Sequence, residues 1–501
     1  MAEETTGTRK ETTSPGKKKT KWAAGAVRTI APAIPLGIAL VHGAMAPKPI
    51  PPVPPPAPIP SSPVAGATGC DTGMPCPLVA QGHPVTWWFV FKLNASKFPK
   101  CGTPASDGAG TDARTCLFDS GRQPSAYPAG FGQRYVVASS DAATLTDGGP
   151  QCLGSSTSDP VGASFSEVYN GNFHYVIWND QPYGDPKIAA CTSKGNCGGP
   201  WGHSKGIVAW NDAGEGFVMQ VSTPSWPAAG NKSFPRKTDG NTLGCVKDDD
   251  VEVSQHFFAL RLTKSDLVLV LQGLANASVV TDPTDSQIVN NGGPADVQAL
   301  VSGLGQQSKS DKLVSGTLST GVQFLSKPSA MHVPPWQMVS AQLGGVGLRT
   351  ATWWASPEMP STTGNSTVSC WDQSLGTPGP VEIATTGTWN NVPFSLAGGL
   401  GTNFNHAKIA VSTTGNTHYA IFGDENQQGA LTSDLTKNGC NSSQDARGGT
   451  FYVLQNDELA TGIAALIAGQ TAETQEGTCP GGGTCTLWVK PSNKTASDAD
   501  E

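Results

Sequence analysis

The sequence has few charged residues, and that scarcity narrows the class of protein. Only 14% of its 501 residues are Asp, Glu, Lys or Arg, and the formal net charge is −7. Proteins that bind nucleic acid at neutral pH usually carry a strongly basic surface, so global charge gives no support for that class. A site for a polyanion must therefore be local, or must work at a pH where carboxylates and histidines take up protons.

Two other absences concern cysteine spacing and apolar runs. No Cys-x-x-C occurs among the 12 cysteines, which argues against a zinc-binding or thiol-redox site. The apolar run Ile30–Val41 is too short for a comfortable membrane span and is interrupted by Pro32 and Pro35. The even number of cysteines in loop-rich surroundings favours disulfides and an oxidising compartment, with their pairing left open.

The ends of the chain predict segments outside the folded body. A lysine-rich stretch precedes Ile30–Val41, and Ala44-Met45-Ala46 follows as a candidate cleavage site. Residues 1–46 therefore predict a signal peptide, with a disordered basic leader as the alternative. Residues 47–68 are proline-rich and predict an extended linker, and residues 490–501 predict a polar tail. We expect an exported protein, secreted or periplasmic, and lysosomal only if it is eukaryotic.

Short apolar runs separated by turn residues recur through the body and predict strands. These runs are Val85–Leu93, Tyr135–Ala138, His174–Trp178, Gly206–Trp210, Gly216–Val221, His256–Leu262, Asp266–Leu271, Val346–Trp354, His406–Val411, His418–Phe422 and Thr450–Leu454. Helices are expected over Ala295–Leu304 and Asp457–Gly469. The pattern predicts a mixed α/β (α+β) fold.

Two stretches about two hundred residues apart resemble each other. Each begins with His-x-Lys, continues as strand, turn and strand, and ends in a polar stop. The first runs from His203 and Lys205 to Ser222, and the second from His406 and Lys408 to Asp424 and Asn426. A His and a Lys two residues apart on a strand point to the same face. The repeat predicts two lobes whose half-sites meet at a pseudo-twofold axis.

The residue types of these two motifs suit phosphodiester cleavage without a metal. A neutral histidine can attack phosphorus, a protonated one can donate to the leaving oxygen, and two lysines can neutralise the phosphoryl oxygens. His203, Lys205, His406 and Lys408 are therefore the predicted catalytic residues. The alternative is that both histidines are unrelated residues of surface strands. We expect structural or solvated roles for the other histidines, which lack this context: His42, His83, His174, His256, His332 and His418.

The chain resembles deoxyribonuclease II, a family of the phospholipase D superfamily with paired catalytic lobes, because several short sequence segments, or blocks, occur in the same order as in that family. The blocks are Gly82–Leu93, Tyr175–Pro182, His203–Gly206, Val221–Pro224, Leu243–Cys245, His406–Lys408, Gly423–Asn426 and Arg447–Thr450. Together they span roughly residues 80–455. The Asn-Asp-Gln-Pro block at Asn179–Pro182, combined with both His-x-Lys motifs, is much more specific than either alone.

The resemblance implies an endonuclease that cleaves double-stranded DNA at acidic pH, without divalent metal or other cofactor, and leaves 3′-phosphate ends. It implies two phospholipase D-like lobes, each a central β-sheet flanked by helices, which we place at residues 69–285 and 286–489. It also implies that Asn179, Ser222, Asp424 and Asn426 line the phosphate site, with turn or cap roles as the alternative. A bacterial member of the family fits the leader and the composition. We expect no stable membrane association, and a homodimer is left open.

The sequence departs from the superfamily pattern in one respect that bears on the mechanism. The usual motif places an Asp shortly after the Lys, but none follows Lys408, and after Lys205 only Asn211 or Asp212 comes near. The group that orients each histidine is therefore open, and so is the division of roles, although we favour His203 as nucleophile and His406 as acid.

Two other functions remain as alternatives. One is a phosphodiesterase of the same superfamily that acts on lipids or small molecules. The other is a non-catalytic, secreted binding or surface protein, which the abundance of small polar residues and the proline-rich linker would fit.

Overall fold

The computed structural model describes most of the chain between Cys70 and residue 486. The described residues are 70, 73–98, 134–149, 152–154, 156–182, 184, 186–191, 196–227, 241, 243, 252–355, 358–399, 401–432, 439–441, 443–474, 476–478 and 484–486. The predicted leader (1–46), linker (47–68) and polar tail (490–501) lie outside the described residues.

The first large sheet has eight strands, all of them antiparallel to their neighbours. From one edge to the other they are β10 (Val289–Asn290), β6 (His174–Asn179), β7 (Lys205–Trp210), β8 (Gly216–Val221), β9 (Gln255–Leu262), β3 (Trp87–Lys92), β4 (Tyr135–Ser139) and β5 (Ala142–Asp147). The central strands β7 and β8 are buried along their whole length, in agreement with their largely apolar sequences.

The second large sheet has seven strands, antiparallel except where β13 and β14 run parallel. Their order is β11 (Val314–Thr317), β12 (Gln323–Lys327), β19 (Gly449–Gln455), β18 (Tyr419–Gly423), β17 (Ile409–Ser412), β13 (Leu348–Ala351) and β14 (Val381–Ile383). Three two-stranded hairpins complete the described strands: β1 (Leu78–Ala80) with β2 (His83–Pro84), β15 (Thr386–Trp389) with β16 (Val392–Ser395), and β20 (Glu476–Thr478) with β21 (Thr484–Thr486).

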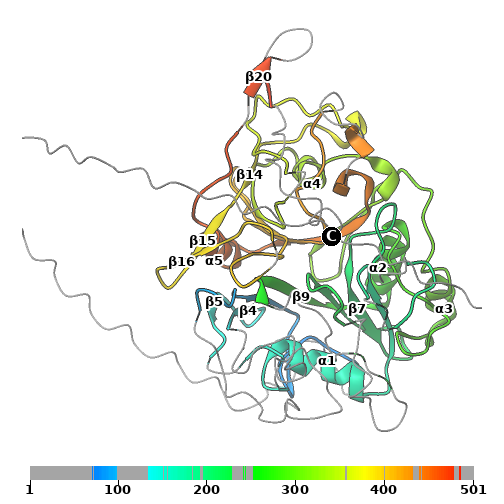
Figure 1. Ribbon diagram of the computed structural model, residues 1–501. Helices are drawn as coiled ribbons and strands as arrows, with labels where there is room; N and C mark the ends of the chain where they lie inside the picture. Colours follow the sequence, from blue (N-terminus) through cyan, green and yellow to red (C-terminus); the bar gives the residue numbers. More distant parts are fainter. Residues whose placement is uncertain are drawn as a thin grey trace, which may run out of the picture. The chain divides into compact units, whose positions relative to one another are not determined.

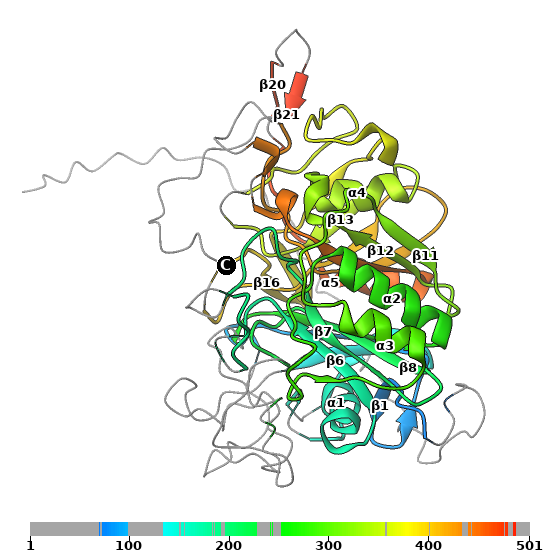
Figure 2. The same ribbon diagram turned by 90° about the vertical axis from the view of Figure 1, so that its right-hand side faces the viewer.

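The described helices are short. They are α1 (Pro160–Asn170), α2 (Lys264–Asn276), α3 (Ala295–Ser302), α4 (Pro335–Gln342) and α5 (Asp457–Leu466), with 3₁₀ turns η3 (Ser329–Met331), η4 (Gln373–Leu375), η5 (Gly439–Asn441) and η6 (Ser443–Ala446). Helices α1, α2 and α5 begin at a residue whose side chain caps the first turn. Asp159 caps α1 and Asn456 caps α5 through side-chain oxygens, each of which accepts a backbone N–H. Helices α2 and α3 lie side by side (Figure 2), and α1 packs against β1 (Figures 1 and 2).

The predicted mixed α/β fold is confirmed, and every predicted strand run but one coincides with a strand of the two large sheets. The exception is Asp266–Leu271, which lies in helix α2. Its continuous apolar sequence after Asp266 resembles a buried strand, but Thr263 and Asp266 form a capping box that starts a helix there. Helix α4 was not predicted because it is buried along nearly its whole length and shows no clear apolar stripe. Helix α1, which starts at the Asp159 cap followed by Pro160, was also not predicted.

Aromatic side chains from both sheets pack together between them. The Phe422 ring of β18 stacks on Phe258 of β9 at a centroid distance of 4.2 Å and on Phe89 of β3 at 4.8 Å. Tyr452 of β19 lies 5.7 Å from Phe258 and 5.2 Å from Phe324 of β12. Because these rings are fully buried, they join the two sheets through one shared apolar core.

Disulfides link cysteines in three described places. They join Cys70 to Cys76, Cys191 to Cys197, and Cys370 to Cys440. Cys152 is also disulfide-bonded. Within the described ranges, no helix has the length and apolar character that crossing a membrane requires.

Candidate active site

Both His-x-Lys motifs lead into a central strand of a large sheet. Lys205 is the first residue of β7, and Lys408 directly precedes β17. Each of these strands then turns into its antiparallel neighbour, β7 into β8 and β17 into β18, as the sequence pattern predicted. The two motifs are therefore placed in the same local setting, one in each sheet.

The fold brings the two histidines together. The ring centroids of His203 and His406 lie 6.2 Å apart with an angle of 69° between the ring planes. Each histidine is only 1% exposed. The separation of the rings is of the size needed for both to contact one phosphate group from different sides.

Each histidine is oriented by a backbone carbonyl that directly follows a strand of the opposite sheet. His203 Nδ1 lies 2.8 Å from the carbonyl oxygen of Asp424, directly after β18, and His406 Nδ1 lies 2.6 Å from that of Ser222, directly after β8. A carbonyl can only accept a hydrogen bond, so Nδ1 carries the proton in both rings. A neutral ring in this tautomer has its lone pair on Nε2, and the buried His203 Nε2 has no partner among the described residues.

The backbone of each motif is also tied to the opposite sheet. The His203 N–H donates to the carbonyl of Gly448, which precedes β19, and the His406 N–H donates to that of Ser254, which precedes β9, each at 2.7 Å. Close approach is required at Gly448, because a Cβ there would lie 2.2 Å from the Ala277 oxygen.

Burial and neighbouring cations favour the neutral form of both histidines. Burial, followed by the charges of Lys205 and Arg447, lowers the pKa of His203 well below its usual range. Burial and the charges of Lys408 and Lys205 lower the pKa of His406 in the same direction, against a small raising effect of its hydrogen bond to Ser222. Protonating either ring therefore requires acidic solution, or a bound anion that offsets the cations.

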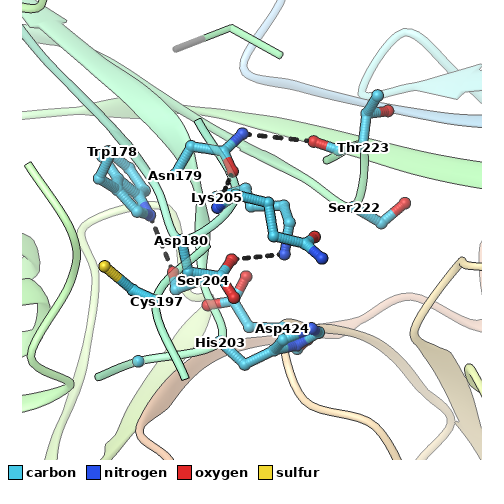
Figure 3. Close-up of polar contacts among 12 residues, drawn as sticks. Trp178, Asn179, Asp180, Cys197, His203, Ser204, Lys205, Ser222, Thr223 and Asp424 are labelled. Carbon is cyan, nitrogen blue, oxygen red and sulfur yellow. Dashed lines mark hydrogen bonds and ion pairs between the residues drawn. The ribbon is translucent and has the colours of Figure 1, made fainter. Parts of the chain in front are cut away.

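The two lysine ammonium groups are held differently. Lys205 Nζ donates to Asp180 Oδ1 at 2.6 Å, and the other oxygen of Asp180 accepts from Arg447 at 2.7 Å. In Figure 3 the side chains of Lys205 and Asp180 point toward one another, with Ser204 close by. Lys408 Nζ donates to the carbonyl of His406 at 2.7 Å. An ammonium group has three N–H donors, so the bond of Lys205 to Asp180 leaves this lysine able to donate to a phosphoryl oxygen as well.

Ser222 and Asp424, predicted to line the phosphate site, both lie beside the histidines. The Asp424 Oδ2 atom accepts from the backbone N–H and the hydroxyl of Thr450, and burial raises the pKa of Asp424 to about 6. The Ser222 hydroxyl donates to Gln255 and accepts from the His256 N–H. Both side chains are therefore used to fix the chain segments whose carbonyls hold the histidines.

Asn179 and Asn426 are engaged within the protein. The Asn179 amide donates to the carbonyl of Trp226 at 3.1 Å, and its oxygen accepts from the Gln181 N–H. The Asn426 amide donates to Gln428 at 2.9 Å. Both residues are buried, so their predicted role as phosphate donors remains a prediction.

Several residues near the site were not singled out from the sequence. Asp180 and Arg447 lie in blocks that carried the resemblance, but no role was assigned to them. His256, expected to be structural, accepts the Lys408 N–H at its Nδ1 atom. The Trp353 ring meets His406 edge-on at a centroid distance of 4.9 Å. Only the N-D-Q-P and R-G-G-T blocks offered a sequence signal for any of these.

The arrangement combines two imidazoles, two ammonium groups and a guanidinium group in a buried setting. Among the described residues, no group of three or more His, Cys, Asp and Glu side chains is arranged to hold a metal ion. What the described groups can do directly is bind an anionic tetrahedral centre, attack it from one side and protonate a leaving oxygen on the other.

A family model described as deoxyribonuclease II matches residues 122–472 of the chain. The match includes both His-x-Lys motifs, Asp180 and Arg447. No curated protein matches the chain.

Proposed function

Because the chain belongs to the deoxyribonuclease II family, and is therefore a nuclease that hydrolyses phosphodiester bonds, we propose that it is an acid endodeoxyribonuclease with His203 and His406 as its catalytic pair. The reaction needs no divalent metal in this proposal and leaves 3′-phosphate ends. The observation that carries it is the pair of buried rings, 6.2 Å apart, each oriented by a carbonyl from the other half of the chain.

The proposed reaction has two steps. His203 Nε2 attacks phosphorus while His406, protonated, donates its Nε2 proton to the 5′ oxygen, so the P–O5′ bond breaks and a phosphohistidine forms. Water then attacks phosphorus and gives a proton to the now neutral His406, which releases a 3′-phosphate and restores His203. The assignment of His203 as nucleophile is supported by its Nε2 lone pair, which no described side chain engages.

Lys205 and Lys408 neutralise the non-bridging oxygens in this mechanism. Their effect is largest in the transition state, where negative charge on those oxygens is greatest. Ser222 and Asp424 act in the proposal by holding the two carbonyls that orient the rings. Asn179 and Asn426 support the loops beside the phosphate.

An acidic working pH follows from the lowered histidine pKa values. The general acid must be protonated before reaction, and burial and the lysines oppose that in the free enzyme. Lower pH supplies the proton and also reduces the negative charge of a protein whose net charge is −7 at pH 7.

The two large sheets are, in this proposal, duplicated lobes related by a pseudo-twofold axis. Support comes from the matching neighbour order of β6, β7, β8, β9 and β3 in one sheet and β13, β17, β18, β19 and β12 in the other. The exchanged carbonyl bonds of the two histidines are also reciprocal. We place the lobes at residues 69–285 and 286–489, with the short strand β10 of the second lobe pairing with β6 of the first.

The proposal also includes export of the protein from the cytoplasm. The disulfides suit an oxidising compartment, secreted or periplasmic, and the leader expected over residues 1–46 would direct the chain there.

Nicking of supercoiled plasmid at pH 5 with excess EDTA tests the function. The wild type should nick, and His203→Ala and His406→Ala should each lose about 10³-fold in rate, because each histidine performs a chemical step. His174→Ala is the matched control, since this half-buried histidine pairs with Asp212 away from the site. Products should block polymerase extension until a 3′-phosphatase is added. Activity that EDTA abolishes, or that survives both alanine substitutions, would overturn the proposal.

A further inference from the structure

We propose that Asp180 is a positioning residue of the nuclease reaction, which holds the Lys205 ammonium at the phosphate site and balances the charge of Lys205 and Arg447 beside His203. This inference rests on the proposed function. It assigns a role to a residue that no catalytic motif includes, and it gives a reason why Arg447, far away in sequence, is buried at the site.

Asp180 is fully engaged by the two cations. One carboxylate oxygen accepts from Lys205 Nζ at 2.6 Å and the other from Arg447 at 2.7 Å. All three side chains are buried. Ion pairs in such a place are short and strongly oriented, because neither partner can find water as an alternative. The position of the Lys205 ammonium is therefore set by Asp180 rather than by the flexible lysine chain.

The sheet register explains why Asp180 can reach Lys205. Asn179, the last residue of β6, pairs directly with Lys205, the first residue of β7. Asp180 is the next residue, so its side chain emerges beside the start of β7. Figure 3 shows the two side chains facing each other across this junction.

Arg447 anchors the far side of the carboxylate. Its guanidinium also donates to the backbone carbonyls of Trp201, Cys197 and Gly202, at 3.1, 2.8 and 3.0 Å. Gly202 directly precedes His203, so the guanidinium fixes the chain that enters the catalytic motif. The Cys197 N–H in turn donates to the carbonyl of Asp180 at 2.7 Å. Asp180 is thus held by both backbone and side chain.

Charge balance is the second consequence of this arrangement. Asp180 is the carboxylate that pairs directly with Lys205 and Arg447, so its loss would leave these two charges near His203 without that paired anion. After burial, which has the largest effect, they already lower the pKa of His203, together with Lys408 and His406. The other carboxylate beside this ring belongs to Asp424, whose Oδ2 atom accepts from Thr450 and whose pKa burial raises to about 6, so that it is largely uncharged at pH 5. Loss of Asp180 should therefore make the site harder to protonate, in addition to releasing the lysine.

The test compares Asp180→Asn and Asp180→Glu with the wild type on a DNA duplex in EDTA. We measure kcat and KM from pH 4 to pH 7, and thermal unfolding at each pH. Asp180→Asn should lower kcat by about 10- to 100-fold with KM changed little. A misplaced lysine weakens the stabilisation of the transition state much more than the binding of the substrate. The pH–rate profile should also move to lower pH by about one unit, because the cations become unbalanced.

Asp180→Glu separates charge from position. It keeps the negative charge, so the pH profile should stay near that of the wild type, whereas kcat should still fall because the carboxylate is displaced. If Asp180→Asn does not fold, this variant carries the test alone. A wild-type kcat in Asp180→Glu would then overturn the proposal.

Glu425→Gln is the control for replacing a buried acid beside a lysine by its amide. Glu425 lies 3.5 Å from Lys327 Nζ, and both are fully buried. Burial raises the pKa of Glu425 to about 8, so at pH 5 it is already uncharged and the amide should leave the pH–rate profile unchanged. If Asp180→Asn alters only the unfolding temperature, as a purely structural residue would, the inference fails. A wild type without nuclease activity in EDTA would instead refute the proposed function itself.

Discussion

Replacement of Glu425 by Gln should change how the free energy of unfolding depends on pH. The Glu425 carboxylate and the Lys327 ammonium are both completely buried. The Lys327 Nζ also donates to the carbonyls of Gln444, Asp445 and Arg447, whereas one oxygen of Glu425 has no partner among the described residues. The cation is thus better satisfied than the anion, and ionisation of Glu425 in the folded protein is costly.

The size of the effect follows from the pKa. Burial raises the pKa of Glu425 from an ordinary 4.5 to about 8, because the attraction of Lys327 only partly offsets the loss of water. A carboxyl group whose pKa is raised stabilises the fold below its unfolded pKa, and that stability is lost as the pH rises through its folded pKa. At about 1.4 kcal/mol per pKa unit, the loss approaches ~5 kcal/mol by pH 8.5. Gln cannot ionise, so the variant escapes this loss.

Urea unfolding at pH 5 and pH 8.5 measures the difference. The wild type and Glu425→Gln should agree within about 1 kcal/mol at pH 5, and the variant should be more stable by several kcal/mol at pH 8.5. Asp212→Asn, at an exposed carboxylate, should show no such divergence. A variant that is less stable than the wild type at pH 8.5 would mean that the ionised pair with Lys327 is net stabilising, and the reasoning would be wrong.

Three further outcomes are expected. Gly448→Ala should cost ~1–3 kcal/mol of stability and reduce nicking, because its Cβ would collide with the Ala277 oxygen; Gly364→Ala, which meets no atom within 4 Å, should do neither in parallel denaturation and nicking assays. Changing Cys191 and Cys197 to Ser should lower kcat clearly but the unfolding temperature only slightly, because this disulfide holds the Cys197 carbonyl that accepts from the Arg447 guanidinium. Wild-type activity at saturating DNA would contradict this. The kcat/KM of the wild type should rise as the pH falls from 7 to 5, because the catalytic pair has lowered pKa values, and a profile flat over that range would count against a general acid in this pair.

Local patterns allowed most of the strands to be predicted. Alternating or continuous apolar runs bounded by turn residues mark β8 and β9 almost to the residue. Helix α2 was misread because its apolar sequence fits both structures, and only the capping box at Thr263 distinguishes them. The pairing of the His-x-Lys motifs was also accessible, because each is followed by the same strand-turn-strand sequence.

Other parts of the site could not be read from the sequence, for physical reasons. The carbonyls that hold His203 and His406 belong to the backbone, so any residue type could have supplied them. Asp180 meets Arg447 across 267 residues of chain, and no local spacing encodes that contact. The family match identified the reaction class, whereas the contacts of the site emerged only once the two sheets were placed against each other.

Each catalytic-site histidine bonds a backbone carbonyl of the opposite half of the chain, and this has a consequence for the protein while it is still folding. A molecule in which only one sheet has formed has a histidine without the acceptor that fixes its ring, since Asp424 and Ser222 each serve the opposite half. If His203 and His406 are the catalytic pair, as proposed, such an intermediate cannot cleave DNA. On that proposal, nuclease activity requires both sheets to be assembled, and an incomplete chain would leave the DNA of its own cell intact.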